Sequence, residues 1–316
     1  MIAVRGPVVL GIEGARLTAA DRERLLHPLV GGVILFSRNY EDLAQLDGLT
    51  ADIRALRTPH LLVSVDHEGG RVQRFRDGFT AVPPMRTLGD LWNEDPQQAQ
   101  REARLAGSVI ARELRARGID FSFTPVLDLD FGNSAVIGDR AFSSDPIVVA
   151  QLATSLCEGL RDGGSAAVGK HFPGHGFVAA DSHLEVPVDE RPLADLFAND
   201  LIPFAALVKA GLEAVMPAHI VYPAVDDKPA GFSRVWIQDI LRDRLGFDGL
   251  VFSDDLGMAG AFTAGDIVAR ADAAIDAGCD MVLTCNEFDA ADELLSRWKP
   301  DAQPRLAERT ARMAGR

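Results

Sequence analysis

Apolar residues recur along the chain in short unbroken runs, and helical patterns separate them. The runs are rich in Val, Ile, Leu and Phe, and continuous rather than alternating hydrophobicity is typical of strands buried on both faces of a parallel sheet. The eight predicted strands are Val8–Ile12, Gly32–Phe36, Leu61–Val65, Phe121–Leu127, Ala166–His171, Ala214–Ala218, Leu250–Ser253 and Met281–Thr284.

The predicted helices are marked by their ends as well as by their apolar spacing. Asp95-Pro96 and Asp145-Pro146 each place an N-cap residue before a proline, the favoured order at a helix start. Gly118 and Gly163 are placed to end these two helices. Further helices are predicted after a capping box at Thr18 and Asp21, over the repeat from Leu43 to Leu56, over Pro192–Ala210, from Ser233 to Gly246, over Ala264–Ala277 and over Ala302–Met313.

Strands and helices therefore alternate, with one weak section at residues 75–93, where Pro83-Pro84 and scattered polar residues predict small local elements. Eight alternations in 316 residues predict an α/β protein built as a single (β/α)8 TIM barrel over residues 1–316, with its active site at the carboxyl rim of the strands. No repeat or linker indicates a second domain. A doubly wound open sheet is the alternative, but no glycine-rich phosphate fingerprint follows the first strand.

Polar residues are expected where a barrel enzyme carries its chemistry, at the carboxyl ends of strands. The amino-terminal ends, in contrast, are expected to be mostly Gly, Ala and Pro. Carboxylates crowded on one rim need cations or donors to offset their burial, and Lys170, Arg74 and Arg140 are the candidates. The residues that follow strands are Asp66 to Arg71, Asp128 and Asp130, Lys170 and His171, His219, Asp254 and Asp255, and Asn286 and Glu287.

Composition narrows the class of partner. The net charge of −14 argues against a nucleic acid or an anionic membrane surface. Cys157, Cys279 and Cys285 show no metal-ligand spacing and are expected to be buried thiols in a reducing compartment. No cleavable signal pattern is evident and no apolar run approaches the ~18 residues of a membrane span. A cytoplasmic monomer without cofactor or metal is expected.

The densest chemistry lies at residues 170–176, KHFPGHG, followed by Asp181-Ser182-His183. In an extended segment residues i and i+2 project to the same side, so Asp181 can orient His183 and raise its pKa. His183 would then be a general acid near neutral pH. An ordinary surface His beside an Asp is the alternative interpretation.

The carboxylates that follow the strands are candidates for different roles. Asp254 directly follows an apolar strand and is a candidate nucleophile toward a carbon electrophile, unless it only caps a loop. Asp66 could accept two hydroxyl hydrogen bonds from a sugar, or form a salt bridge with Arg71 or Arg74. Asp128 and Asp130 fit a site and a loop-holding role equally well. The residues alone therefore leave the roles of Asp254, Asp66 and the Asp128–Asp130 segment open.

Five spaced segments together resemble the β-N-acetylglucosaminidases of glycoside hydrolase family 3, and more narrowly the short cytoplasmic β-hexosaminidases of bacterial peptidoglycan recycling. The resemblance runs from about residue 8 to residue 286, and no second α/β/α domain, which many larger members carry, is expected. The segments are VDHEGGRVQR at 65–74, IGDRAF at 137–142, KHFPGHG at 170–176, DSH at 181–183 and FSDDLGM at 252–258.

The resemblance implies residue roles and a reaction. Asp254 would be the nucleophile and His183 the proton donor and acceptor, with Asp181 as its partner. The residues implied to bind the terminal N-acetylglucosamine are Asp66, Arg74, Arg140, Lys170 and His171. The implied substrate is N-acetylglucosaminyl-1,6-anhydro-N-acetylmuramic acid, with or without its peptide, hydrolysed with retention.

Other functions remain open at this point. A histidine acid departs from the usual retaining pair of carboxylates ~5 Å apart. Substrate-assisted hydrolysis by the acetamido group and phosphorolysis are two alternatives. A metal-dependent hydrolase could use His67, His171, His175 and Asp66. Outside catalysis, the chain could be a sugar-binding protein without turnover.

Overall fold

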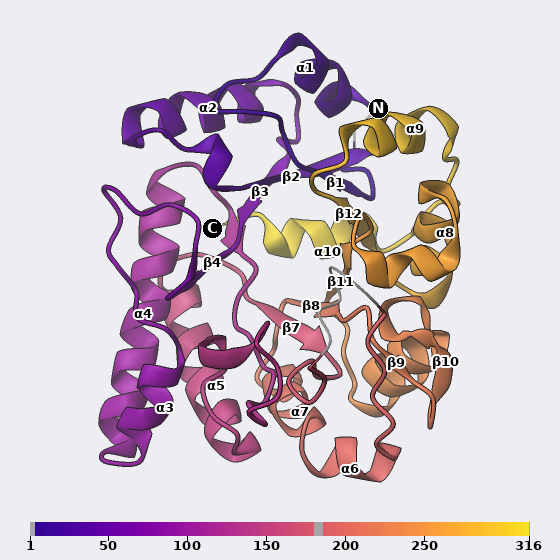
Figure 1. Ribbon diagram of the computed structural model, residues 1–316. Coiled ribbons are helices and arrows are strands. Elements are labelled where there is room, and N and C mark those ends of the chain that lie inside the picture. Colours follow the sequence, from indigo (N-terminus) through magenta and orange to yellow (C-terminus); the bar gives the residue numbers. More distant parts are fainter. Residues whose placement is uncertain (1–3, 180–185, 316) are drawn as a thin grey trace.

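The structure is a computed structural model that describes residues 4–179 and 186–315, and a barrel of parallel strands lies at its centre (Figure 1). All eight predicted strands are confirmed. The barrel strands are β1 (Val8–Leu10), β2 (Val30–Leu35), β3 (Leu62–Val65), β6 (Phe121–Ser122), β7 (Val168–Phe172), β8 (Ala214–Pro217), β11 (Leu250–Asp255) and β12 (Met281–Thr284). Two short antiparallel hairpins lie outside it, β4 (His67–Gly69) with β5 (Val72–Gln73) and β9 (Val221–Tyr222) with β10 (Asp226–Pro229).

The strands follow one another around the barrel in chain order. The hydrogen-bonded order is β6-β3-β2-β1-β12-β11-β8-β7, which leaves β6 and β7 as neighbours across the closing seam. Two parallel bridges close that seam, from Phe121 to Ala166 and from Val126 to Lys170. The α/β barrel prediction is therefore confirmed and the open-sheet alternative is wrong.

The helices form a ring outside the strands, from α1 and α2 through α4, α5 and α7 to α8 and α9 (Figure 1). Their bounds are α1 (Ala19–Leu26), α2 (Leu43–Ala55), α3 (Arg86–Trp92), α4 (Pro96–Ala116), α5 (Pro146–Asp162), α6 (Leu193–Ala198), α7 (Leu201–Lys209), α8 (Ile267–Ala277), α9 (Phe288–Arg297) and α10 (Leu306–Met313). A π-helix, η4 (Val235–Arg244), completes the ring, and the 3₁₀ turns are η1 (Ser37–Asn39), η2 (Gly138–Arg140), η3 (Ala230–Phe232) and η5 (Ala259–Ala264).

The helix starts follow from the predicted caps. The Thr18 hydroxyl accepts a hydrogen bond from the Asp21 backbone N at 3.0 Å, and the Asp21 carboxylate accepts from the Thr18 backbone N, which completes a capping box. Asp95 and Asp145 each accept from a backbone N in the first turn, ahead of a proline. Satisfying these N–H groups fixes where α1, α4 and α5 begin.

The strands are buried on both faces, as their continuous hydrophobicity predicted. Val8 and Leu10 of β1 pack outward under the helices, whereas Val9 packs inward. Inside the barrel the rings of Phe121, Phe123 and Phe252 contact one another with centroids 5.2–5.6 Å apart. The barrel interior is thus a packed core, and only its carboxyl end is left to form a site.

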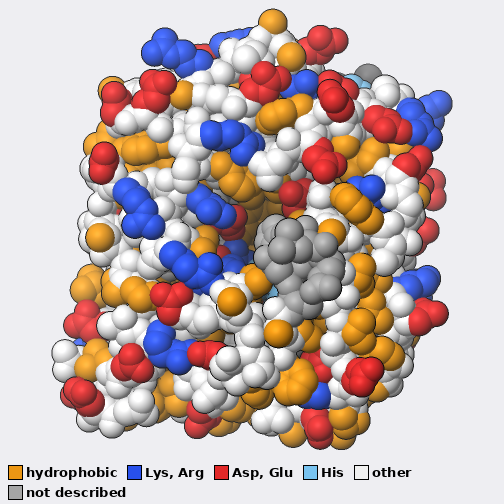
Figure 2. Space-filling view, viewed as in Figure 1, with side chains coloured by type: hydrophobic (Ala, Val, Ile, Leu, Met, Phe, Trp, Pro, Cys, Tyr) orange, Lys and Arg blue, Asp and Glu red, His pale blue; other side chains and the backbone are white. Residues whose placement is uncertain are grey.

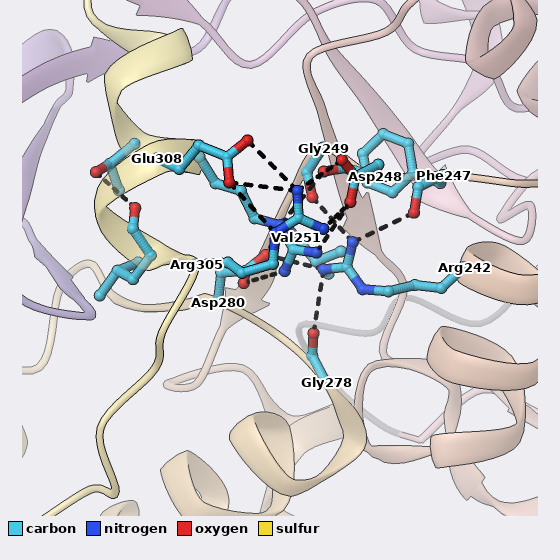
Figure 3. Close-up of polar contacts among 12 residues, drawn as sticks. Arg242, Phe247, Asp248, Gly249, Val251, Gly278, Asp280, Arg305 and Glu308 are labelled. Carbon is cyan, nitrogen blue, oxygen red and sulfur yellow. Dashed lines mark hydrogen bonds and ion pairs between the residues drawn. The ribbon is translucent and has the colours of Figure 1, made fainter.

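Helix α10 closes the opposite, amino-terminal end of the barrel. Leu306 and Met313 pack against the interior side chains of the strands. Arg309 donates to Asp280, which directly precedes β12, at 2.6 Å. Asp280 also accepts from Arg242 at 2.9 Å, so one buried carboxylate joins α10, η4 and β12 (Figure 3).

The amino-terminal ends of the strands are not the bland Gly, Ala and Pro segments expected, and that expectation was wrong. Acidic residues precede four strands and each is held by arginine. They are Asp120 before β6, Glu213 before β8, Asp248 before β11 and Asp280 before β12. Because each carboxylate is paired, this end of the barrel is polar for structural reasons.

Several helix boundaries also differ from the prediction. The helix predicted over Pro192–Ala210 is interrupted, because Asn199 leaves helical backbone and the neighbouring Asp200 is buried against Arg191 at 2.8 Å. Helix α9 has no counterpart among the predicted helices. The strand expected over Phe121–Leu127 is shorter, since Pro125 has no N–H to continue the ladder.

The three cysteines are buried free thiols, as expected. Over the described part of the chain, no helix combines the length and the hydrophobicity needed to cross a membrane.

Candidate active site

A pocket of about 540 Å³ opens at the carboxyl ends of the strands. Figure 2 shows a hollow near the middle of this face, with Lys and Arg side chains gathered on one side of it. Its lining includes six of the residues singled out from the sequence, namely Asp66, Arg74, Arg140, Lys170, His171 and Asp254. The carboxyl ends of β3, β7 and β11 therefore meet as the barrel interpretation required.

The segment VDHEGGRVQR forms the end of β3 and the β4–β5 hairpin. Gly69 and Gly70 have φ of 106° and 55°, conformations that glycine adopts most readily, and they make the turn. A Cβ on Gly69 would lie 2.7 Å from the Pro83 carbonyl oxygen, so the turn packs too closely for a side chain. The hairpin folds Arg74 back toward Asp66, whose Oδ2 lies 3.5 Å from the Arg74 guanidinium.

Two carboxylates and two cations form the floor of the pocket. The Lys170 ammonium donates to Asp66 Oδ1 at 2.8 Å and lies 2.6 Å from Glu68 Oε1. Arg140 makes a bidentate pair with Glu68 at 2.8 and 2.9 Å. The expectation that Lys170, Arg74 and Arg140 offset the acidic rim is therefore confirmed by contact.

The pKa values follow from this mutual contact. Burial alone would raise the pKa of Glu68, but Arg140 and Lys170 hold it far below its ordinary value. Burial alone would lower the pKa of Lys170, but Asp66 and Glu68 raise it above its usual range. The pKa of Asp66 is also lowered, because the attraction of Lys170 outweighs the effect of burial. All of these groups are charged near neutral pH.

A second buried carboxylate holds the KHFPGHG segment. Asp128 Oδ1 accepts from the backbone N of His171 at 3.2 Å and of His175 at 2.7 Å, and Oδ2 lies 2.7 Å from His171 Nδ1. Of the two roles left open for Asp128, the structure shows the loop-holding one. The contact also orients the His171 ring, which lines the pocket.

Asp254 lies at the end of β11 with a different environment. Its Oδ1 accepts from the Asp255 backbone N at 2.8 Å, and no Lys or Arg among the described residues lies at ion-pair distance from it. Asp255 also lines the pocket, but its Oδ1 accepts from the backbone N of Gly257 and of Cys285. Burial, reinforced by repulsion from Asp254, raises the pKa of Asp255 to about 6.

Four further residues named from the sequence are not among these six. Asp181 and His183 fall outside the described residues. Asp130 pairs with Arg86 at 2.5 Å and has a loop role. Arg71 contacts Asp139 rather than Asp66.

The metal-ligand set proposed from His67, His171, His175 and Asp66 is not assembled. The His67 ring packs against Phe75 and Phe79, with centroids 6.2 and 5.5 Å away. Burial lowers the pKa of His67 to about 4. Within residues 4–179 and 186–315, no three or more His, Cys, Asp or Glu side chains are placed to hold a metal ion together.

Glu68 was missed as a site residue. Its signal was present in the sequence, since Asp66 and Glu68 are two residues apart at a strand end and such residues project to the same side. Only the structure shows that both reach Lys170.

Comparison with known proteins decides the family. The model of the glycosyl hydrolase family 3 N terminal domain matches residues 2–314. The chain belongs to glycosyl hydrolase family 3. A beta-hexosaminidase of Chromobacterium violaceum is 61% identical over 312 residues, covering 99% of this chain and 87% of the relative. One of Thiobacillus denitrificans is 61% identical over 310 residues, covering 98% and 86%.

Solved structures of the same family share the fold. NagZ from Neisseria gonorrhoeae, in complex with N-trifluoroacetyl-D-glucosamine, is 53% identical with a TM-score of 0.94 over 99% of this chain and 91% of that one. A beta-N-acetylhexosaminidase from Beutenbergia cavernae is 32% identical with a TM-score of 0.82, covering 92% and 88%. The family and these relatives confirm the expected enzyme class, a glycoside hydrolase of the β-hexosaminidase kind that acts on carbohydrate.

Proposed function

We propose that this enzyme removes terminal β-linked N-acetylglucosamine with retention, through a glycosyl–enzyme intermediate on Asp254. The observation that carries the proposal is the placement of Asp254, a carboxylate without a cationic partner among the described residues, in the same pocket as the Asp66–Lys170 pair. An ionised carboxylate aimed into a pocket is available to attack an anomeric carbon. The paired carboxylates nearby are not available in this way.

The polar floor of the pocket suits a sugar. Asp66 keeps lone pairs for hydroxyl groups, since the one contact of its Oδ2 with a described residue is the 3.5 Å contact with Arg74. Lys170 at the end of β7 and Arg140 on η2 add charged donors, and the His171 ring adds a further polar group. A crystal structure of the gonococcal relative holds an N-acylated glucosamine, which supports N-acetylglucosamine as the sugar here.

In the first step Asp254 attacks the anomeric carbon while the bond to the leaving oxygen breaks, and His183 gives that oxygen its proton. In the second step water attacks the same carbon, His183 takes the proton, and the bond to Asp254 breaks. Asp181 would orient His183 for both transfers. The proposed natural substrate is N-acetylglucosaminyl-1,6-anhydro-N-acetylmuramic acid, with or without peptide, in cytoplasmic peptidoglycan recycling by a single-domain monomer.

Trapping the intermediate tests the nucleophile. The enzyme is incubated with a 5-fluoro-N-acetylglucosaminyl fluoride, and intact and peptide mass spectra are recorded. One glycosyl mass on the peptide that carries Asp254 is expected, and none in Asp254→Asn. Asp276→Asn, on the exposed face of α8, is the control and should label like the unmodified enzyme. Hydrolysis of an aryl N-acetylglucosaminide without any adduct would instead indicate participation of the acetamido group.

Two further measurements test the remaining assignments. His183→Ala should retain more activity on aryl glycosides with good leaving groups than on poor ones, and equal losses would contradict the acid role. Product analysis with and without inorganic phosphate separates hydrolysis from phosphorolysis. Absence of any turnover on aryl N-acetylglucosaminides would favour a sugar-binding protein.

A further inference from the structure

Glu68 stands between the two cations of the pocket floor and is not among the residues implied to bind sugar. It lies in β4 and is only 2% exposed. Its Oε1 accepts from Arg140 at 2.8 Å and contacts the Lys170 ammonium at 2.6 Å, and its Oε2 accepts from Arg140 Nε at 2.9 Å. Both oxygens are therefore engaged by charged donors.

The neighbouring Asp66 is used differently. Its side chain is 18% exposed, against 3% for Glu68, and within residues 4–179 and 186–315 its Oδ2 has only the long contact with Arg74. A sugar hydroxyl can therefore reach Asp66, whereas reaching Glu68 would require breaking a charge-assisted bond. Both carboxylates line the pocket, but Asp66 keeps the freer oxygen, whereas both oxygens of Glu68 are already engaged by cations.

Glu68 fixes the positions of the Arg140 guanidinium and the Lys170 ammonium. The bidentate contact fixes the plane of the Arg140 guanidinium, because both bonds must be satisfied together. Apart from Glu68, the one hydrogen-bond acceptor of Arg140 among the described residues is the Val136 carbonyl oxygen, at 3.1 Å. The positive charge of Arg140 also disfavours the charged form of Lys170. A negative charge between them is needed to keep both cations, buried as they are, on one side of the pocket.

We propose that Glu68 is a positioning residue for sugar binding, which sets the geometry of Lys170 and Arg140 without touching the sugar. This inference rests on the proposed function, in which these two cations bind the N-acetylglucosamine unit. Glu68→Gln keeps the shape of the side chain but removes its charge and places an amide N–H against one of the cations. The affinity for N-acetylglucosamine should therefore fall about tenfold or more, the range expected for loss of a charged hydrogen bond.

The test measures Kd for N-acetylglucosamine by calorimetry, KM and kcat for an aryl N-acetylglucosaminide, and Tm. We expect Glu68→Gln to raise Kd and KM together, with a smaller change in kcat. Glu158→Gln is the matched control, because Glu158 pairs with Arg104 at 3.2 Å on the exposed surface of α5. It should leave Kd and KM unchanged.

A double variant shows whether Glu68 acts through Arg140. If it does, Glu68→Gln combined with Arg140→Met should raise Kd by much less than the product of the two single effects. Glu68→Asp keeps the charge but is one methylene shorter, so it cannot meet both cations and should give an intermediate Kd. It also serves if Glu68→Gln does not fold.

The outcomes separate two failures. If the unmodified enzyme neither binds N-acetylglucosamine nor hydrolyses the aryl glycoside, the proposed function is wrong. If it does both, and Glu68→Gln or Glu68→Asp lowers Tm while Kd and KM stay unchanged, Glu68 only stabilises the fold and the inference is overturned. Strictly multiplicative effects in the double variant would also overturn it.

Discussion

Replacing Asp128 by Asn should reverse the hydrogen bond that orients His171. Asp128 is buried and accepts three hydrogen bonds, from the backbone N of His171 and of His175 and from His171 Nδ1. In Asp128→Asn the amide oxygen can still accept from both backbone groups, but the amide nitrogen would face Nδ1 as a donor. The His171 ring must then accept at Nδ1 and carry its proton on Nε2.

The expected loss of stability follows from the two backbone bonds. Each changes from a charge-assisted bond of about 1.5–3 kcal/mol to a neutral one of about 0.5–1.5 kcal/mol, which gives a loss of about 2 kcal/mol for the pair. A chain of 316 residues has an unfolding entropy near Tm of about 0.7 kcal/mol per kelvin. Differential scanning calorimetry should therefore show Tm about 3 °C lower for Asp128→Asn. Asp128→Ala, which leaves both N–H groups unsatisfied, should lose more.

Asp128→Asn should also change function, by an amount comparable to its effect on stability. A reversed tautomer presents a donor to the pocket where the native ring presents an acceptor, so we expect KM for an aryl N-acetylglucosaminide to rise about tenfold. Asp130→Asn is the control, because Asp130 contacts Arg86 and the Gly132 backbone N outside the pocket. A native KM in Asp128→Asn would refute the proposal that Asp128 orients His171. An unchanged Tm would refute the proposal that the Asp128 charge strengthens its hydrogen bonds to the two backbone N–H groups.

Three further predictions concern stability. Gly176→Ala should not accumulate as folded protein, since a Cβ there would lie 1.6 Å from the Leu129 carbonyl oxygen, and soluble expression with a thermal scan checks this. Asp280→Ala should cost about 3–5 kcal/mol, because Arg242 loses its carboxylate partner and the one carboxylate contact that Arg309 keeps among the described residues is the 3.5 Å contact with Asp248. The protein that folds should have native KM, and thermal unfolding and kinetics measure the two effects. The raised pKa of Asp255, about 6 against an ordinary value near 3.8, means that the unfolded chain releases this proton first. The protonated carboxyl therefore stabilises the fold at low pH, and on the order of 2–3 kcal/mol of stability is lost as pH rises from about 4 through 6. The difference in Tm between Asp255→Asn and the unmodified enzyme should grow over the same pH range.

The barrel could be predicted from the sequence because its strands are buried on both faces. In the run Leu250–Ser253 three apolar residues are followed by a serine that is itself buried, so no side chain faces solvent and hydrophobicity marks the strand. Strand ends then located the pocket residues, since Asp254 and Lys170 terminate such runs. Helix starts were equally predictable where a capping side chain precedes a proline, as at Asp95, whereas α8 begins after its cap Asp266 and not at Ala264 as predicted.

What could not be predicted depends on contacts distant in sequence. The interruption before α7 comes from Asp200, which is drawn into a buried pair with Arg191 and approached by the loop at Gly174. Nothing in the local pattern of residues 192–210 indicates that contact. Glu68 was missed for a similar reason, because its importance comes from Arg140, which lies on η2, outside the barrel strands.

Charged residues cluster at both ends of the barrel. Such a cluster at the ends of strands therefore does not by itself indicate an active site. At the amino-terminal end Asp280 is engaged by two arginines and a backbone N, and α10 covers the cluster (Figure 3). At the carboxyl end Glu68 is equally saturated. The difference lies in Asp66 and Asp254, which keep oxygen atoms without a close cation inside an open pocket. A carboxylate oxygen without a close cation can still accept from a hydroxyl group or attack an anomeric carbon, whereas a fully paired one cannot. The presence of such oxygens distinguishes the carboxyl end of the barrel, which forms the pocket, from the amino-terminal end, where the charges are structural.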